Sequence, residues 1–184
     1  MNNNKKIAIV DCDSFYCSVE RVFNPESIGK PVCVLSNNDG CVIARSKESK
    51  LLGIKMGEPY FQKKDFMKEN GVYVYSSNYN LYGDMSDRVF STIKKYANDV
   101  EVYSIDEAFI DFSNLPDDEL MDRLHFIKNE VKRLTGIPVS IGVGPNKTLA
   151  KLTSHIAKKQ PSYDGVCSYW ELENFRNSLY EIPG

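Results

Sequence analysis

The spacing of apolar residues alternates along the chain between strand-like and helix-like patterns, and this predicts a mixed α+β fold. KKIAIVDCD (5–13) has the short apolar run of a buried strand, and SFYCSVERVF (14–23) continues with helical spacing. The other expected strands are 32–36, 41–45, 72–75, 100–105, 108–113, 138–144 and 165–170, and the other expected helices are 46–53, 84–97, 117–135 and 146–159. Between 54 and 83 only VYVY (72–75) is strand-like, so the rest of that stretch is expected to be irregular.

With residues 24–80 set aside, the elements follow the order strand, helix, strand, strand, helix, strand. That order is typical of the split βαβ or ferredoxin-like fold, an antiparallel or mixed sheet with helices on one face. Residues 24–80 would form a small inserted α+β lobe beside it. The topology would place the first strand next to the 100–113 hairpin, so that the acids at their ends, Asp11, Asp13, Asp106 and Glu107, lie close together.

Composition limits the classes of protein to be considered. The 184 residues suffice for one domain with a small inserted lobe, and the net charge of −2 argues against strong phosphate-driven DNA binding by this chain alone. No apolar run is long enough to span a bilayer, and the first residues lack the features of a secretory signal. Five cysteines without a Cys-x-x-Cys pair are typical of reduced thiols in a cytoplasmic protein.

An acidic pair lies between two strand-forming runs in VYSIDEAFID (102–111), at Asp106 and Glu107. Carboxylates beside buried β-structure cost stability unless a positive partner lies against them. A divalent cation shared with Asp11 would be such a partner, because Mg²⁺ prefers oxygen ligands. Two such ions, about 3.5–4 Å apart, can stabilise the attacking and leaving oxygens of a phosphoryl displacement. The alternative for either motif alone is a set of solvated turn residues.

Two basic groups are candidates for binding phosphate. GVGPNKTLAK (142–151) passes from a strand through a Gly-Pro turn into a helix with Lys147 in its first turn, although it lacks the Walker A pattern. The second group is Arg45, Lys47 and Lys50, around the start of the helix at 46–53. The alternative for both groups is a solvated surface. The last helix ends in Lys158 and Lys159, which suit its dipole and for which no functional role is expected.

Two other functional classes compete with a metal-dependent phosphoryl transferase. IAIVDCDSF (7–15) also fits a haloacid-dehalogenase-type phosphatase with Asp11 as nucleophile, and GDMSD (83–87) superficially matches that group's late acidic motif. However, Ser14 and Phe15 stand where those enzymes usually have Gly-Thr or Gly-Val, and the 100–113 hairpin does not suit their parallel sheet. The third class is a non-catalytic interaction module, which would bind partners without turnover.

Three motifs together resemble the Y-family translesion DNA polymerases: DCDSFYCSVE (11–20), SIDEAFID (104–111) and VGPNKTLAK (143–151), in the family's order. The segment 29–61, GKPVCVLSNNDGCVIARSKESKLLGIKMGEPYF, is most similar to the UmuC-type branch, the polymerase subunit of the bacterial SOS mutagenesis enzyme. The resemblance covers nearly the whole chain. It implies error-prone, template-directed transfer of dNMP from dNTP to a primer 3′-OH, in DNA damage bypass during the SOS response.

The resemblance also implies a division into domains. Residues 1–23 and 81–170 would form the catalytic palm, 24–80 the fingers lobe, and 171–184 the start of a thumb. Family members are much longer, so the chain is expected to be a palm-and-fingers fragment, engineered or truncated, with weak or no processive synthesis. The implied partners are primer–template DNA and dNTP, together with a UmuD-type subunit, a recombinase filament and the sliding clamp, and no membrane.

The family's metal site carries over to four residues of this sequence. Asp11, Asp106 and Glu107 would hold two Mg²⁺ ions, with the backbone carbonyl of Cys12 as a further ligand. Glu107 would serve as a metal ligand, as a proton acceptor, or as both.

The family's nucleotide site carries over in the same way. Phe15 and Tyr16 would lie under the incoming nucleotide, and the ring of Tyr16 would occupy the space that a ribose 2′-OH needs. Lys50 and Lys147 would contact the triphosphate. Lys50 stands where many members have arginine, and Lys47 where many have tyrosine, so a point charge would replace the bidentate fork of an arginine. Residues 41–44 would cover the nascent base pair.

Overall fold

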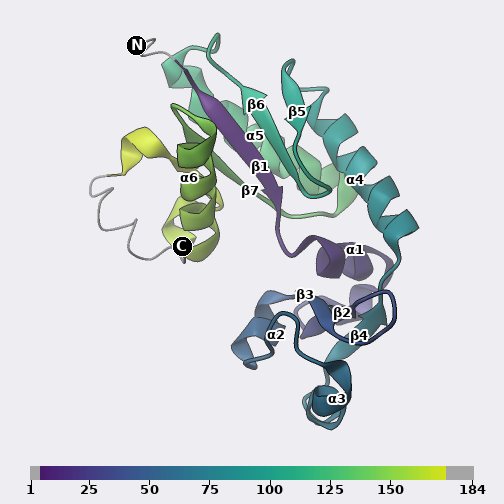
Figure 1. Ribbon diagram of the computed structural model, residues 1–184. Coiled ribbons are helices and arrows are strands. Elements are labelled where there is room, and N and C mark those ends of the chain that lie inside the picture. Colours follow the sequence, from purple (N-terminus) through teal and green to yellow (C-terminus); the bar gives the residue numbers. More distant parts are fainter. Residues whose placement is uncertain (1–4, 173–184) are drawn as a thin grey trace. The chain divides into compact units, whose positions relative to one another are not determined.

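The computed structural model describes residues 5–172, and the chain divides into two compact units (Figure 1). The first, the sheet unit, comprises Met1–Asp13 and Ser86–Gly184, and the second, the inserted unit, comprises Ser14–Met85. The helix that follows the first strand therefore groups with the inserted unit, whereas the expected palm includes it. Residues 173–184, most of the expected thumb segment, lie outside the described residues.

The sheet unit contains one five-stranded sheet with the order β5-β6-β1-β7-β8. Its strands are β5 Val100–Val102, β6 Glu107–Asp111, β1 Ile7–Cys12, β7 Val139–Gly144 and β8 Val166–Ser168. The central strand β1 is antiparallel to both β6 and β7, and β8 runs parallel to β7. Without β8, the order is that of the split βαβ fold, which confirms the expected class. The antiparallel centre contradicts the phosphatase alternative, because that fold needs a parallel sheet.

The two faces of this sheet are covered by different helices. Successive side chains of a strand point to opposite faces, so Ile9 and Asp11 share one face of β1 while Val10 lies on the other. Ile9 packs with Phe109 and with Ala150 of α6 (Lys147–Lys159). Figure 1 shows α6 on one side of the sheet and α5 (Asp117–Thr135) on the other. The expected placement of all helices on one face therefore fails for α6.

Helix α6 approaches β7 closely because Gly142 has no side chain. A Cβ atom at Gly142 would lie 2.1 Å from the backbone N of Ser154 and 2.3 Å from the backbone O of Ala150, both in α6. Gly142 is the register partner of Ile9, so the contact lies on the same sheet face as Asp11. This close approach brings the side chains of α6 within reach of the acids on β1.

The inserted unit has its own sheet and its own apolar core. The strand order is β3-β2-β4, with β2 antiparallel to β3 and parallel to β4. Its strands are β2 Val32–Leu35, β3 Val42–Arg45 and β4 Tyr73–Ser76, and its helices are α1 Phe15–Phe23, α2 Lys47–Leu51 and α3 Tyr60–Glu69. Helix α4 (Tyr79–Ile93) contains the boundary between the units. The core consists of Cys33, Leu35, Val42, Ile54 and Met67.

The expectation of an irregular stretch over most of 54–83 is wrong in two places. Helix α3 lies inside this stretch. Met67 is its buried residue, so the helix has no strong apolar stripe, and Pro59 at its start provides no side-chain cap that could mark the beginning of a helix. Helix α4 begins at Tyr79 rather than at residue 84, and the large side chain buried in its first turns is a tyrosine and not an aliphatic residue, while Tyr79 itself is exposed. Tyr82 is fully buried.

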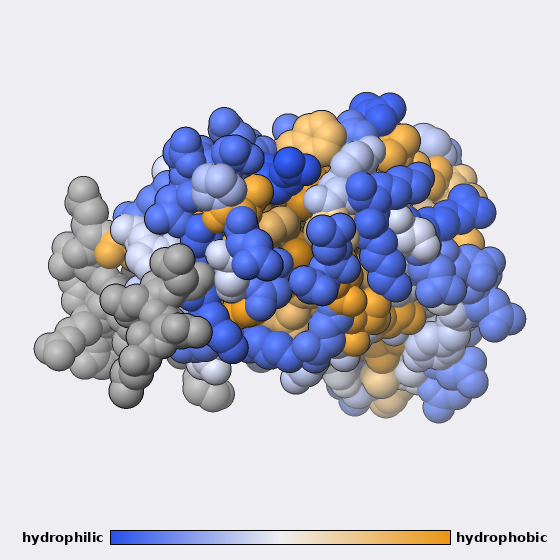
Figure 2. Space-filling view, turned by 90° about the horizontal axis from the view of Figure 1, so that it is seen from above, coloured by the Kyte–Doolittle hydropathy of each residue, from blue (hydrophilic) through white to orange (hydrophobic). Residues whose placement is uncertain are grey.

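Within residues 5–172, no helix combines the length and the apolar character needed to cross a membrane. The face seen in Figure 2 is mostly hydrophilic, with hydrophobic patches between the polar side chains. All five cysteines are free thiols, and four of them are buried.

The substitution Gly142→Ala tests the close contact between α6 and β7. The new methyl group would collide with helix backbone, which cannot move aside as a flexible side chain can, so a loss of at least about 2 kcal/mol in the free energy of unfolding is expected. Gly83→Ala in α4 is the control, because nothing lies within 4 Å of its added Cβ. Alanine should stabilise that helix by about 0.5–1 kcal/mol. Urea denaturation followed by circular dichroism measures both, and equal effects would contradict the contact.

Candidate active site

Asp11 and Glu107 lie opposite each other on the adjacent strands β1 and β6. The preceding residue, Asp106, is held at the same place, because its backbone O accepts a hydrogen bond of 2.9 Å from the backbone N of Cys12. The sheet thus brings together acids that are almost a hundred positions apart in the sequence, as the motif analysis predicts.

Lys158 of α6 lies directly against the acids of β1. Its Nζ is 2.5 Å from Oδ1 of Asp11 and 3.6 Å from Oδ1 of Asp13. Burial raises the pKa of Asp11 from the ordinary 3.8 to about 6; Lys158 opposes the rise, and the charges of Glu107 and Asp106 add to it. Burial lowers the pKa of Lys158, but Asp11, Asp13 and Asp106 together more than reverse that effect. Lys158 therefore stays charged at neutral pH.

The other acids also have partners within the protein. Lys151 Nζ is 3.1 Å from Glu107 Oε2. Ser104 Oγ donates a hydrogen bond of 2.7 Å to Asp106 Oδ1. Asp13 accepts from Ser140 Oγ, at 2.9 and 3.1 Å. These contacts satisfy carboxylates that would otherwise be buried without compensation.

The basic residues of α6 fall on one stripe of the helix. Lys151, His155 and Lys158 are spaced by four and three residues, which places them one above the other on a single face. Lys158 is the residue of this cluster that sequence reasoning missed, and its spacing of two turns from Lys151 is the signal that could have found it. Lys147, at the start of the stripe, pairs instead with Glu101 at 2.6 and 2.7 Å.

A cavity of about 580 Å³ runs along this stripe, lined by Asp11, Glu107 and Lys158 among others. Ser154 Oγ and His155 Nε2 also belong to residues that line it, and both atoms are buried without a hydrogen-bond partner among residues 5–172. Burial, followed by the charges of Lys159 and Lys158, lowers the pKa of His155, so its ring is neutral at pH 7. The cavity therefore combines carboxylates, ammonium groups and unsatisfied polar atoms, a lining that suits a charged ligand with bound water.

The donor chemistry of the acids fits a hard divalent cation, since Asp11, Asp106 and Glu107 offer carboxylate oxygens. Within residues 5–172, however, no three His, Cys, Asp or Glu side chains are grouped as a finished metal centre. Each of the three carboxylates has a partner within the protein, Lys158, Ser104 or Lys151. A metal ion would have to displace these partners.

Cys12 can contribute to such a centre only through its backbone. Its side chain is 2% exposed and points to the sheet face opposite to that of Asp11. Burial, reinforced by the charges of Asp11 and Asp106, raises the pKa of its thiol well above the ordinary value. The thiol is therefore uncharged and turned away from the acids.

Tyr16 is held in an aromatic cluster of the inserted unit. Its ring stacks on that of Tyr82, with centroids 4.3 Å apart and an interplanar angle of 18°, and meets the edge of Tyr79 at 6.1 Å. Tyr82 donates a hydrogen bond of 2.7 Å to Oε1 of Glu20, which fixes the stack. Phe15, the other expected nucleotide contact, is only 4% exposed. Tyr16 thus presents a half-buried ring with a defined orientation.

The basic residues of the inserted unit differ in environment. Lys47 and Lys50 are exposed on α2, whose first turn is capped by the Ser46 side chain. Arg45 donates a hydrogen bond of 2.7 Å to the backbone O of Ile54 and so has a structural role. In 41–44, Val42 and Ala44 are buried while Cys41 and Ile43 are half-buried. Phe15, Tyr16 and Lys50 belong to the inserted unit, whereas Lys147 and the acids belong to the sheet unit.

Solved structures of similar fold are DNA polymerases of the Y-family, which confirms the resemblance found in the motifs. The insertion ternary complex of Dbh DNA polymerase superposes with a TM-score of 0.82 at 31% identity, covering 97% of this chain and 54% of that one. DinB from Sulfolobus solfataricus superposes with a TM-score of 0.81 at 29% identity, with the same coverage of both chains.

The chain belongs to the impB/mucB/samB family, whose model matches residues 10–155. It is 48% identical to protein UmuC of Salmonella typhimurium over 178 residues, which are 96% of this chain and 42% of that protein. It is also 35% identical to DNA polymerase IV of Saccharolobus solfataricus, over 97% of this chain and 52% of the relative. The chain thus spans about half, or less, of the length of these relatives.

The substitution Tyr82→Phe tests how Tyr16 is held. Burial raises the pKa of Glu20 and the hydrogen bond from Tyr82 opposes that rise, so losing the hydroxyl leaves a buried carboxylate without its donor. A loss of about 1–2 kcal/mol in the free energy of unfolding is expected. Tyr96→Phe removes a hydroxyl that donates to Glu130, which is less buried than Glu20 and keeps its hydrogen bonds from Arg133, so a smaller loss is expected there. Chemical denaturation of the three proteins makes the comparison, and equal losses would refute the role of burial.

Proposed function

We propose that this chain is the catalytic part of an error-prone Y-family translesion DNA polymerase of the UmuC type. It would transfer dNMP from dNTP to a primer 3′-OH during DNA damage bypass in the SOS response. The observation that supports this most directly is the position of Asp11 opposite Glu107, with Asp106 hydrogen-bonded through its backbone to Cys12. Membership of a family that includes DNA polymerases gives these acids a reaction to serve.

Asp11, Asp106, Glu107 and the Cys12 carbonyl are the proposed ligands of two Mg²⁺ ions. Relatives of this class imply a divalent metal cofactor, and four oxygen donors favour Mg²⁺ over softer metals. When bound, such ions favour ionisation of the attacking hydroxyl and neutralise charge on the phosphates. Before binding, Lys158 and Lys151 pair with the carboxylates of Asp11 and Glu107 and offset part of their mutual repulsion.

The remaining roles are positional. Phe15 and Tyr16 would support the sugar and base of the nucleotide, and Lys50 and Lys147 would bind its triphosphate as point charges. Catalysis of this kind depends on positioning and electrostatics more than on covalent protein chemistry. The proposed partners are primer–template DNA, a UmuD-type subunit, a recombinase filament and the sliding clamp, in a cytoplasmic setting. The support for these partners is family membership. No contact among residues 5–172 identifies their binding sites.

Binding of dATP with Mg²⁺ tests the proposed site. Asp11→Asn and Glu107→Gln should each weaken binding at least about ten-fold, because each removes a negative charge from the proposed metal ligands. Asp111→Asn is the matched control, since Asp111 is an exposed acid at the other end of β6 and should leave affinity unchanged. Isothermal titration calorimetry of the full chain measures the three affinities and that of the parent.

Two outcomes would count against the proposed function. If the parent chain binds no nucleotide at Mg²⁺ concentrations up to the millimolar range, the non-catalytic interaction module becomes the better assignment. If Asp111→Asn weakens binding as much as Asp11→Asn does, the loss reflects net charge and not metal ligation.

The proposed role of Tyr16 in sugar selection predicts a change in specificity. Tyr16→Ala should reduce the preference for dATP over ATP several-fold, because removing the ring opens the space that a 2′-OH needs. Tyr73→Ala, in β4 of the same unit, is the control and should keep the preference of the parent. Competition between the two nucleotides in the same calorimeter measures this ratio. An unchanged ratio in Tyr16→Ala would remove the residue from the proposed nucleotide site.

A further inference from the structure

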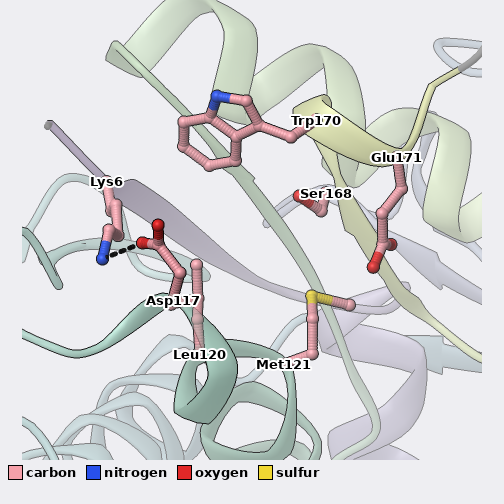
Figure 3. A pocket seen from close by; sticks show the side chains of 7 residues that line it. All are labelled: Lys6, Asp117, Leu120, Met121, Ser168, Trp170 and Glu171. Atoms are coloured by element: carbon pink, nitrogen blue, oxygen red, sulfur yellow. Dashed lines mark ion pairs between the residues drawn. The ribbon is translucent and has the colours of Figure 1, made fainter. Parts of the chain in front are cut away.

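A second cavity of the sheet unit lies away from the acids, between α5 and the short 3-10 helix Tyr169–Glu171 (Figure 3). Its volume is about 360 Å³, and its walls include Lys6, Asp117, Leu120, Met121, Trp170 and Glu171. Lys6 immediately precedes β1 and Asp11 lies near its end, roughly 17 Å further along at about 3.4 Å per residue, and the two cavities share no lining residue. The catalytic proposal makes no use of these residues.

One wall of this cavity is an exposed tryptophan. Trp170 is 51% exposed although indole rings bury a large apolar area, and its ring is held edge-on by Tyr169 at 6.1 Å. Figure 3 shows Trp170 and Glu171 on one side of the cavity and the side chains of Leu120 and Met121, from α5, on the other. The site therefore offers an aromatic surface and an apolar floor to a flat or flexible group.

The charge of the cavity is negative. Lys6 is only 6% exposed and is already neutralised, because its Nζ pairs with Asp117 and donates to the backbone O of Leu115. Glu171 has no ion pair with any residue in the described part of the chain, and the side chain of Asp117 is 88% exposed. The lining thus holds one lysine against two carboxylates, a net charge of −1. Glu171 is also exposed to solvent, so a cation can approach its carboxylate from outside the described fold.

An anionic ligand fits this site poorly. The start of α5 would attract phosphate through its dipole, but Asp117, Asp118 and Glu119 fill its first turn and already provide the negative charge that the dipole favours. The backbone phosphates of DNA would meet the same acids and be repelled. The surface is therefore suited to a cationic group on a partner, and not to the nucleic acid.

We propose that this cavity is the docking site for an arginine side chain of a basic segment in a partner protein. The guanidinium would stack on the indole of Trp170 and pair with Glu171, which arginine does better than lysine because its charge is planar and forked. The methylene groups of the arginine would lie against Leu120 and Met121. Neither contact depends on whether the chain has polymerase activity.

The chain provides its own probe, because Trp170 is its single tryptophan. Titration with an acetylated and amidated Gly-Leu-Arg-Leu-Gly peptide should change the Trp170 emission in a saturable way. The same peptide with citrulline in place of arginine keeps the shape and loses the charge, and it should bind about five-fold more weakly or worse. Glu171→Gln should weaken binding of the arginine peptide to a similar extent and leave binding of the citrulline peptide unchanged.

Two further variants separate a built site from general attraction to acidic surface. Met121→Ala should weaken binding of both peptides, because it removes part of the apolar floor of the cavity. Glu119→Gln is the matched control, an exposed acid of the same helix that does not line this cavity, and it should leave affinity within about two-fold of the parent. Circular dichroism of each variant verifies that the fold is retained.

The proposal fails if the citrulline peptide binds as well as the arginine peptide, or if Glu171→Gln binds the arginine peptide as the parent does. It also fails if Glu119→Gln and Glu171→Gln weaken binding equally. A saturable change in Trp170 emission with inorganic phosphate or a short DNA duplex, without one for the arginine peptide, would assign the cavity to an anion instead.

Discussion

The carboxylates of Asp11 and Glu107 lie opposite each other on neighbouring strands, where like charges repel and partial burial strengthens the repulsion. The sheet unit can hold this pair only because α6 brings Lys158 and Lys151 against them. For the lysines to reach, the backbone of α6 must approach β7 more closely than any side chain at position 142 would allow. The close packing of α6 on β7 thus links three features: Gly142, the lysines of α6, and the acids Asp11 and Glu107 on β1 and β6.

The same constraint determines which partners a cation would have to displace at these acids. Lysine ammonium groups are removable partners, because they lie on long side chains that can move to another anion. If the proposed function holds, binding of divalent cations would free Lys151 and Lys158, and the same cavity would then offer two positive charges to phosphate. The orphaned polar atoms of Ser154 and His155 lie along the same cavity. The ion pairs that stabilise the acids in the free protein would then cost affinity for the metal, a common compromise at functional sites.

The spacing of apolar residues along the chain predicted the helices and strands that have a clear apolar stripe or run. The apolar stripe of α5 gave bounds of 117–135, which the structure reproduces, and the order of strands around the 100–113 hairpin was enough to bring Asp11 to Glu107. Helix α3 was not predicted because it has almost no apolar stripe, and its packing depends on Met67 entering a core built by distant strands. The ion pair of Lys158 was not predicted for a related reason. Its formation depends on how closely α6 packs on the sheet, and Gly142 of β7 permits that close packing.

Each end of β1 combines carboxylates with a lysine, but the cations proposed to bind at the two ends differ. Near its end the two partners are about equally exposed, with 29% of the Lys158 side chain and 22% of the Asp11 side chain accessible, and the neighbours of Asp11 are further acids that attract concentrated positive charge. Before its start the buried partner is a base, Lys6, and the acids stand outward beside a half-exposed indole. Such an edge cannot strip water from a small ion, but it can bind a cation that brings its own apolar stem. Burial within the ion pair is thus even at Asp11 and Lys158 but strongly uneven at Lys6 and Asp117, and the ligands proposed for the two ends differ in the same sense, a compact ion at the first and a cation with an apolar stem at the second.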